Sequence, residues 1–138
     1  MTITPNEIET MKEPIERAFG SVLTYGLGLG YYAFMTSEKD NVETVTIVES
    51  NRDVIDLFIN HILPQFKHKD KIKIIESDAF DFAKNKTRIG QYDMVFTDLW
   101  HDVSDGMDLY IKMKQYEDKL PNAIHLYWIE KSILCYLY

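Results

Sequence analysis

Several features that define common protein classes are scarce in this sequence. Among its 138 residues there is one cysteine, Cys135, so an internal disulfide cannot form and a reducing cytoplasm is the natural setting. No run approaches the roughly 18 apolar residues that a membrane-spanning helix needs. The first residues show no basic segment followed by an apolar one. We therefore expect a cytoplasmic protein with neither a secretory signal nor a membrane anchor.

Positive charge is scarce as well. The formal net charge is -7, and the basic side chains are scattered except for the alternate lysines between 67 and 73. Binding to duplex nucleic acid draws on clustered lysines and arginines that replace counterions on the phosphates. We interpret the 67–73 run as a solvated loop that leads into a strand. We expect a small-molecule substrate and no nucleic acid.

What the sequence does contain is a regular alternation of two kinds of segment. Short β-branched or apolar runs lie at 21–25, 44–49, 71–75, 93–97 and 123–128, and segments with helical spacing separate them. Strand–helix alternation predicts a mostly parallel sheet with right-handed crossovers and helices on both faces. The chain length suits one domain with one core. The predicted fold is therefore a single Rossmann-like, doubly wound α/β domain.

Three of the intervening segments have clear helical periodicity. The first, 6–18, is a leading helix that Pro14 should bend or split, because proline lacks the N–H of a helix interior. The second, 51–63, follows Asn51, a plausible N-cap residue. The third is 105–118.

Three glycines at alternate positions follow the first strand. Gly26, Gly28 and Gly30 lie where a strand must turn sharply into a helix. Glycine permits positive φ angles, and without a Cβ it lets a ligand lie against the backbone. The helix that follows would offer unpaired N–H groups to a carboxylate or a phosphate. The alternative is a tight turn whose glycines serve packing only. Because the segment also fits the dinucleotide pattern G-x-G-x-x-G/A, the loop alone does not identify the ligand.

Acidic residues follow the second and third strands. In parallel sheets ligands bind beyond the carboxyl ends of the strands, so these positions are candidate ligand contacts. Glu49 can accept hydrogen bonds from both ribose hydroxyls of an adenosine, unless it is merely exposed at a strand end. Asp78 can accept a hydrogen bond from the exocyclic amine of an adenine, with Ala79 or Phe80 beside the ring. The alternative for Asp78 is a cap on a short helix over 79–84, which is compatible with ligand contact.

The segment after the fourth strand is the densest chemical cluster, with three acids, an imidazole and an indole in eight residues. Asp98 is the first candidate to face a reacting centre, and His101 could act as a base near neutral pH. The ring of Trp100 could line a site for a cation, because aromatic faces attract positive charge. Two other interpretations stay open: Asp102 or Ser104 caps the next helix, or the acids form a solvated loop. A metal site that includes His101 would have no established ligand spacing, and we expect none.

Taken together, the four strand ends resemble class I S-adenosylmethionine-dependent methyltransferases, particularly their spermidine-synthase-like branch. The resemblance covers about 20–128 and rests on the residues at 22–30, 45–49, 76–80 and 92–98. It implies S-adenosylmethionine as the cofactor and distributes its parts over the candidate residues: the amino-acid part at Gly26, Gly28 and Gly30, the ribose at Glu49, the adenine at Asp78 and Ala79, and the transfer site at Asp98.

The sequence predicts an organisation in three parts: a leading helix over 1–19, a cofactor-binding core over 20–128 and a tail over 129–138. The sheet is expected to depart from the family's pattern, because it is shortened after its fifth strand. Just before the first glycine, where many relatives carry an acid, this sequence has Tyr25. That exchange is expected to weaken recognition of the cofactor's ammonium group.

The function implied by the resemblance is methyl transfer to an unknown small acceptor, which Asp98 and His101 would orient or deprotonate. Two alternatives stay open. One is a non-catalytic cofactor-binding domain that forms a homodimer through an exposed sheet edge, which the apolar tail 133–138 could cover. The other is aminopropyl transfer to a polyamine, a cationic acceptor that the acids of 98–108 suit. A nicotinamide-dependent dehydrogenase ranks last.

Overall fold

The sheet confirms the predicted fold class. The structure, a computed structural model, describes residues 9–28, 30–100 and 102–137. Its strands are arranged in the order β3-β2-β1-β4-β5, and each neighbouring pair is parallel. Each strand lies within two residues of its predicted run; the bounds are β1 (Gly20–Tyr25), β2 (Val42–Glu49), β3 (Ile72–Glu76), β4 (Met94–Thr97) and β5 (Ile124–Tyr127).

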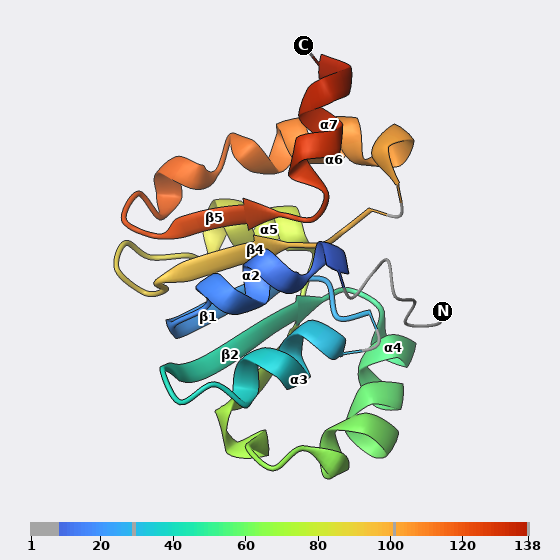
Figure 1. Ribbon diagram of the computed structural model, residues 1–138, viewed down its shortest axis with the longest axis vertical. Coiled ribbons are helices and arrows are strands. Elements are labelled where there is room, and N and C mark those ends of the chain that lie inside the picture. Colours follow the sequence, from blue (N-terminus) through green and yellow to red (C-terminus); the bar gives the residue numbers. More distant parts are fainter. Residues whose placement is uncertain (1–8, 29, 101, 138) are drawn as a thin grey trace.

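Helices cover both faces of this sheet, and each face has its own buried cluster of apolar side chains (Figure 1). One face packs against α2 (Lys12–Arg17), α3 (Tyr31–Ser37) and α4 (Arg52–Leu57). The other face packs against α5 (Ala79–Asn85), α6 (Val103–Lys114) and α7 (Glu130–Leu137). None of these helices, over the ranges that the structure describes, is long and apolar enough to cross a membrane.

Successive side chains of β1 point to opposite faces, as the pleat of a strand requires. Val22 belongs to the cluster under α2 and α3, whereas Leu23 and Tyr25 belong to the cluster under α5 and α6. The strand therefore turns Thr24 toward the α2–α3 side. This alternation determines which side chain at the end of β1 can contact a ligand on the α2–α3 side of the sheet.

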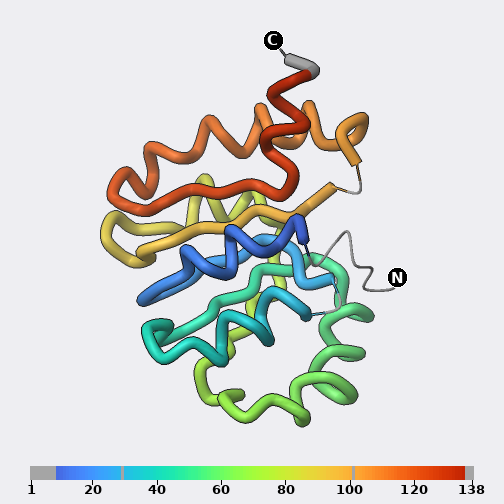
Figure 2. The backbone as a smooth tube through the Cα atoms, in the orientation of Figure 1, coloured from blue at the N-terminus to red at the C-terminus, as the bar shows by residue number. Residues whose placement is uncertain are grey.

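The leading segment is split, as Pro14 predicts. Residues 9 and 10 are helical, Met11 lies in a turn, and α2 resumes at Lys12. The backbone tube in Figure 2 follows this segment across one face of the sheet toward β1. Proline at position 14 cannot donate to the carbonyl of Thr10 and its ring crowds that carbonyl, so the break falls one turn before the proline.

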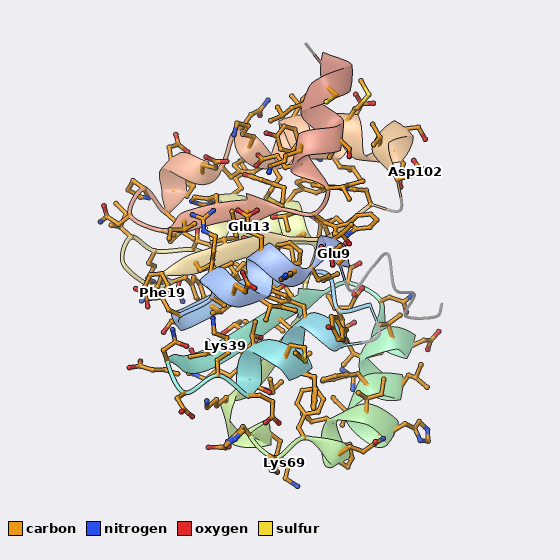
Figure 3. The ribbon with its side chains drawn as sticks, viewed as in Figure 1. Glu9, Glu13, Phe19, Lys39, Lys69 and Asp102 are labelled. Carbon is orange, nitrogen blue, oxygen red and sulfur yellow. The ribbon has the colours of Figure 1, made fainter. Side chains whose placement is uncertain are left out.

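Lys39 anchors the far end of α2. Its ammonium Nζ donates to the carbonyl oxygens of Ile15, Glu16 and Ala18, each at 2.7 Å. Figure 3 shows Lys39 below the end of this helix. The last carbonyls of a helix have no partner within it, and a cation there also complements the helix dipole. Lys39 therefore fixes the position of a helix whose other end borders the cavity described below.

We expect Lys39→Met to lower the free energy of unfolding by about 1–3 kcal/mol, because three carbonyls lose a charged donor at once. Urea denaturation followed by circular dichroism measures this loss. Lys12→Met, at an exposed lysine of the same helix, is the matched control and should change stability by less than about 0.5 kcal/mol. Equal effects of the two substitutions would contradict an anchoring role for Lys39.

The segment after Asn51 begins as predicted but changes its helical form. The side-chain oxygen of Asn51 accepts from the backbone N–H of Asp53 at 2.9 Å and from that of Val54 at 3.3 Å, which confirms the N-cap. After α4 the chain forms a π-helical turn over Phe58–Ile62 and then a tight 3-10 turn. Pro64 lies in that last turn, where its missing N–H ends the regular ladder.

Two segments differ from their expected forms. Three lysines of the 67–73 run are exposed, as expected, but the Nζ of Lys71 donates to the carbonyl oxygens of Ser37 at 3.1 Å and Lys39 at 3.0 Å. This lysine therefore secures the end of α3. The expected tail, in turn, forms the helix α7, which packs against α6 and buries Ile133 completely within the core of one sheet face.

Candidate functional site

A cavity of about 450 Å³ opens at the carboxyl ends of the strands. Its lining includes residues at the ends of β1, β2 and β4 and in the turn after β5. The arrowheads of the strands labelled in Figure 1 point toward this side of the molecule. Small-molecule and cofactor sites have volumes of about 300–1,000 Å³. The cavity therefore has the size of such a site and lies where ligands of parallel sheets bind.

Glu49 forms part of the cavity wall at the end of β2. Its half-buried carboxylate accepts from the backbone N–H of Leu27 through Oε1, at 2.9 Å, and from that of Asn51 through Oε2, at 3.1 Å. The carboxylate thus ties the glycine loop to the start of α4. A carboxylate offers about four lone-pair positions, so both oxygens can also accept from a ligand hydroxyl.

The glycines of the loop serve two purposes. Gly26 and Gly28 line the cavity, whereas Gly30 does not, and all three have positive φ angles (95°, 54° and 84°). A Cβ on Gly26 would lie 2.1 Å from the carbonyl oxygen of Asp98, and one on Gly30 would lie 2.6 Å from the Phe58 ring. Close packing therefore requires glycine at both of these positions, in addition to whatever a ligand requires at Gly26.

Asp98 follows β4 and is half-buried in the cavity wall. Its backbone N–H donates to the carbonyl of Tyr25 at 2.9 Å, which holds the ends of β4 and β1 together. Trp100, two residues further on, also lines the cavity but is only 3% exposed. Its ring stacks on Tyr127, with 6.4 Å between the centroids, so the indole belongs mostly to the core.

Other predicted site residues lie elsewhere. Asp78 and Ala79 are not among the residues that line the cavity. The side chain of Asp78 accepts from the backbone N–H of Asp81 at 2.9 Å and caps α5, which is the alternative open for it in the sequence. Their contact with an adenine therefore stays a prediction. His101, the predicted base, lies outside the described residues.

Asp102 caps α6, which is one of the two interpretations left open for the acids after β4. Its side chain accepts from the backbone N–H of Asp105 at 3.1 Å, and the Asp105 carboxylate accepts from the N–H of Asp102 at 2.8 Å. These reciprocal bonds form a capping box. The hydroxyl of Ser104 donates to Asp102 at 2.6 Å, and this bond lowers the pKa of the Asp102 carboxyl below its usual value.

The structure corrects the expectation for Tyr25. Its side chain is 2% exposed and packs under α5, where its ring centroid lies 6.2 Å from that of Phe82. Burial raises the pKa of this phenol. Thr24, one residue earlier, is the side chain of this strand end that borders the cavity. Strand alternation could have identified it, because Thr24 and Tyr25 must point to opposite faces.

Two cavity residues had no signal in the sequence. Met11 reaches the cavity from the turn before α2, and Trp128 reaches it from the turn after β5. The indole Nε1 of Trp128 donates to the hydroxyl oxygen of Thr10 at 2.9 Å, across 118 positions of the sequence. Only the folded chain brings these two segments together, so neither residue could be assigned from a local motif.

The charge of the cavity is negative. Among the described residues that line it there are two carboxylates, Glu49 and Asp98, and no lysine or arginine. A site of this sign attracts cations and disfavours polyanions such as a pyrophosphate. No group of three or more histidine, cysteine, aspartate or glutamate side chains is arranged to hold a metal ion, within the residues that the structure describes.

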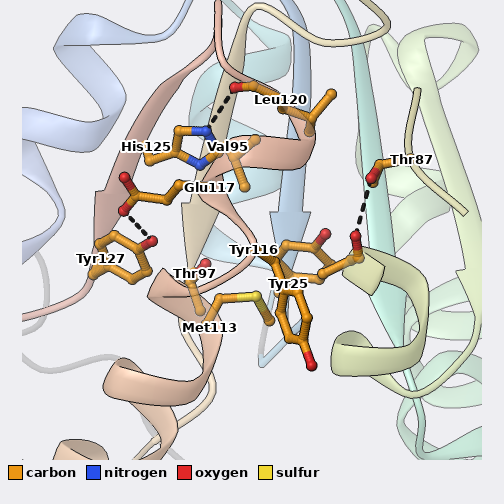
Figure 4. Close-up of a pocket in the computed structure, with 11 residues that line it drawn as sticks. Tyr25, Thr87, Val95, Thr97, Met113, Tyr116, Glu117, Leu120, His125 and Tyr127 are labelled. Carbon is orange, nitrogen blue, oxygen red and sulfur yellow. Dashed lines mark hydrogen bonds between the residues drawn. The ribbon is translucent and has the colours of Figure 1, made fainter. Parts of the chain in front are cut away.

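A second cavity lies on the opposite face of the sheet, between β4, β5 and α6 (Figure 4). In it the Tyr127 hydroxyl donates to Glu117 at 2.5 Å, and the ring Nε2 of His125 lies 2.9 Å from the carbonyl oxygen of Leu120. Its volume is about 10 Å³, which is close to the space that one water molecule needs. This cavity is too small for a substrate, and the contact of His125 with the Leu120 carbonyl gives this histidine a structural role.

The all-parallel order of the sheet, with a cavity at its carboxyl edge, is the arrangement of a Rossmann-like methyltransferase domain. Residues 20–124 match the model of the spermine/spermidine synthase domain family. Because this match spans more than half of the 138 residues, the chain belongs to the spermine/spermidine synthase domain family. The resemblance to the spermidine-synthase-like branch of the class I methyltransferase superfamily is thereby confirmed. No curated protein sequence matches the chain significantly.

Solved structures share the fold at low sequence identity. A precorrin-8w decarboxylase from Methanobacterium thermoautotrophicum matches with a TM-score of 0.65 and 15% identity, over 98% of this chain and 70% of that chain. A conserved hypothetical protein from Streptococcus pyogenes matches with a TM-score of 0.62 and 16% identity, over 84% of this chain and 68% of that chain. A candidate O-methyltransferase from Klebsiella pneumoniae matches with a TM-score of 0.59 and 12% identity, over 83% of this chain and 52% of that chain. At these identities the likeness is one of fold.

Proposed function

We propose that this chain binds S-adenosylmethionine in the cavity at the strand ends and transfers its methyl group to a small acceptor. The observation that supports this most is that one cavity brings together the backbone of Gly26 and Gly28 with the carboxylates of Glu49 and Asp98. These residues lie at or just beyond the ends of three different strands, and they are the ones expected to meet the amino-acid part, the ribose and the transfer site.

The residues present fit the chemistry of this cofactor. Glu49 has lone pairs left for the two ribose hydroxyls, and the loop it holds in place presents backbone rather than side chains at two glycines. The negative character of the cavity suits a ligand that carries a sulfonium and an ammonium group. A dinucleotide, with its pyrophosphate, fits this wall less well.

Asp98 would act on the acceptor. When bound, S-adenosylmethionine supplies an electrophilic methyl carbon, to which the acceptor's lone pair bonds while the C–S electron pair stays on sulfur. The carboxylate of Asp98 would accept a hydrogen bond from the nucleophilic O–H or N–H, orient its lone pair and pass the released proton to water. Because transfer is an in-line displacement, most of the acceleration comes from proximity and orientation.

Aminopropyl transfer is the second candidate, since the family model that matches residues 20–124 describes spermine and spermidine synthases. The same cavity would then hold a decarboxylated cofactor, and the acceptor would be an amine. Glu49 would keep its role toward the ribose, so methyl transfer and aminopropyl transfer both require this carboxylate at the β2 side of the cavity.

Calorimetric titration of the full chain with S-adenosylhomocysteine and with decarboxylated S-adenosylmethionine tests this function. We expect saturable binding of S-adenosylhomocysteine with a dissociation constant in the micromolar range, about -8 kcal/mol. Tighter binding of the decarboxylated compound would favour aminopropyl transfer. Saturable binding without turnover on any acceptor would favour the non-catalytic domain. If neither compound binds, the proposed cofactor is wrong.

A further inference from the structure

The cavity has two halves that differ in chemistry. The sheet order places the ends of β2, β1, β4 and β5 side by side. Glu49, Asn51 and Gly28 line the half at β2 and β1, whereas Asp98 and Trp128 line the half at β4 and β5. If the ribose of the proposed cofactor lies at Glu49, the acceptor is left with the β4–β5 half.

Trp128 is held in a fixed position in that half. Its backbone N–H donates to the carbonyl of Thr97 at 2.9 Å, and its carbonyl accepts from the indole of Trp100 at 3.0 Å. Its own indole donates to Thr10 at 2.9 Å. The next residue, Ile129, has a φ angle of 50°, in the left-handed region that β-branched residues rarely adopt. Backbone strain of this kind is concentrated at functional sites, where the surrounding structure maintains it.

The β4–β5 half presents ring and aliphatic surface with one charged group. Because the indole N–H of Trp128 bonds to Thr10, Trp128 offers a ligand only its ring surface, whereas Trp100, at 3% exposed, adds almost none. Met11 and Leu99 add apolar surface. Among the described residues of this half, Asp98 supplies the one carboxylate. A ligand here meets the ring of Trp128, the aliphatic side chains and one fully charged hydrogen-bond acceptor.

We propose that the acceptor is a flat, apolar ring with a single hydroxyl or amino nucleophile, and that Trp128 determines this specificity. The ring lies against the indole of Trp128 while the nucleophile faces Asp98. Aromatic rings gain from such contacts beyond the area they bury. A polyamine, by contrast, carries several spaced ammonium groups, each of which needs its own polar partner once it leaves water. This inference rests on the proposed function, because it assigns the other half to the cofactor.

Ligand-observed NMR on the full chain saturated with S-adenosylhomocysteine tests the proposal, with 2-naphthol and putrescine as probes. We expect 2-naphthol to bind saturably and more tightly than putrescine. Trp128→Ala should weaken 2-naphthol about fivefold or more, because the aromatic contact is lost. Thr10→Val keeps the ring of Trp128 but removes the hydroxyl to which its indole N–H donates. This variant should weaken the binding of 2-naphthol about threefold, because the Trp128 side chain must then be ordered when the ligand binds.

Phe19→Ala is the matched control, since Phe19 is also a partly exposed aromatic residue but lies beside the amino end of β1. It should leave the affinity for 2-naphthol unchanged. Tighter binding of putrescine than of 2-naphthol would overturn the proposal, as would unchanged affinity in Trp128→Ala. If that variant does not fold, unchanged affinity in Thr10→Val would overturn it. Failure of wild-type protein to bind S-adenosylhomocysteine would instead overturn the proposed function.

Discussion

Gly26→Ala is expected to lower the free energy of unfolding by about 3–5 kcal/mol, most of the roughly 5 kcal/mol that a marginally stable domain has. Two costs combine at this position. The φ angle of 95° is unfavourable for alanine, and the new Cβ would lie 2.1 Å from the carbonyl oxygen of Asp98. That oxygen belongs to the backbone that continues β4, so it cannot move away without separating the ends of two paired strands.

Gly90→Ala separates these two costs. Gly90 has a similar φ angle, 82°, but nothing lies within 4 Å of a Cβ built there. Alanine at position 90 should therefore cost only about 1–2 kcal/mol, the strain of the left-handed conformation. Urea denaturation of both variants measures the difference. Equal losses would mean that the close approach of β1 and β4 can relax, and that Gly26 is needed for its φ angle alone.

Glu49→Gln is expected to weaken S-adenosylhomocysteine binding about 30-fold or more. The carboxylate accepts from two backbone N–H groups, and hydrogen bonds to a charged acceptor contribute about 1.5–3 kcal/mol each. The side-chain oxygen of glutamine can accept from one of these backbone N–H groups, but its NH₂ group then faces the other N–H, which is also a donor. The glycine loop loses part of its anchor, and the ribose hydroxyls lose a charged acceptor.

Calorimetry on this variant needs a control on the same strand. Glu43 lies near the start of β2, is exposed and is far along the strand from the cavity, so Glu43→Gln removes the same charge without touching the site. It should bind S-adenosylhomocysteine as the wild type does. Wild-type affinity in Glu49→Gln would mean that neither the charged anchor of the loop nor a charged contact with the ribose contributes to binding.

The fold could be predicted because its determinants are local. Each strand is a short β-branched or apolar run bounded by polar residues, and Asn51 and Pro14 mark helix boundaries by their own backbone chemistry. The positions of Glu49 and Asp98 at the cavity follow from the same rule, since the ends of parallel strands lie on one edge of the sheet.

The rest of the site depends on contacts between distant segments. Met11 and Trp128 meet at the cavity through the bond between Trp128 and Thr10, and no local pattern marks either of them. The role of Gly30 depends on the ring of Phe58, which a π-helical turn brings against it. The position of Tyr25, by contrast, follows from a local rule: side chains alternate along β1, so the side chain next to the first glycine points to the face opposite the cavity.

The most direct test of cofactor binding at Glu49 is an NMR titration of isotopically labelled protein with S-adenosylhomocysteine. We expect the backbone amide signals of Leu27 and Asn51, whose N–H groups both donate to Glu49, to shift together and to saturate at one concentration. Saturable binding that leaves both signals in place, with shifts confined to residues remote from the carboxyl ends of β1 and β2, would contradict it.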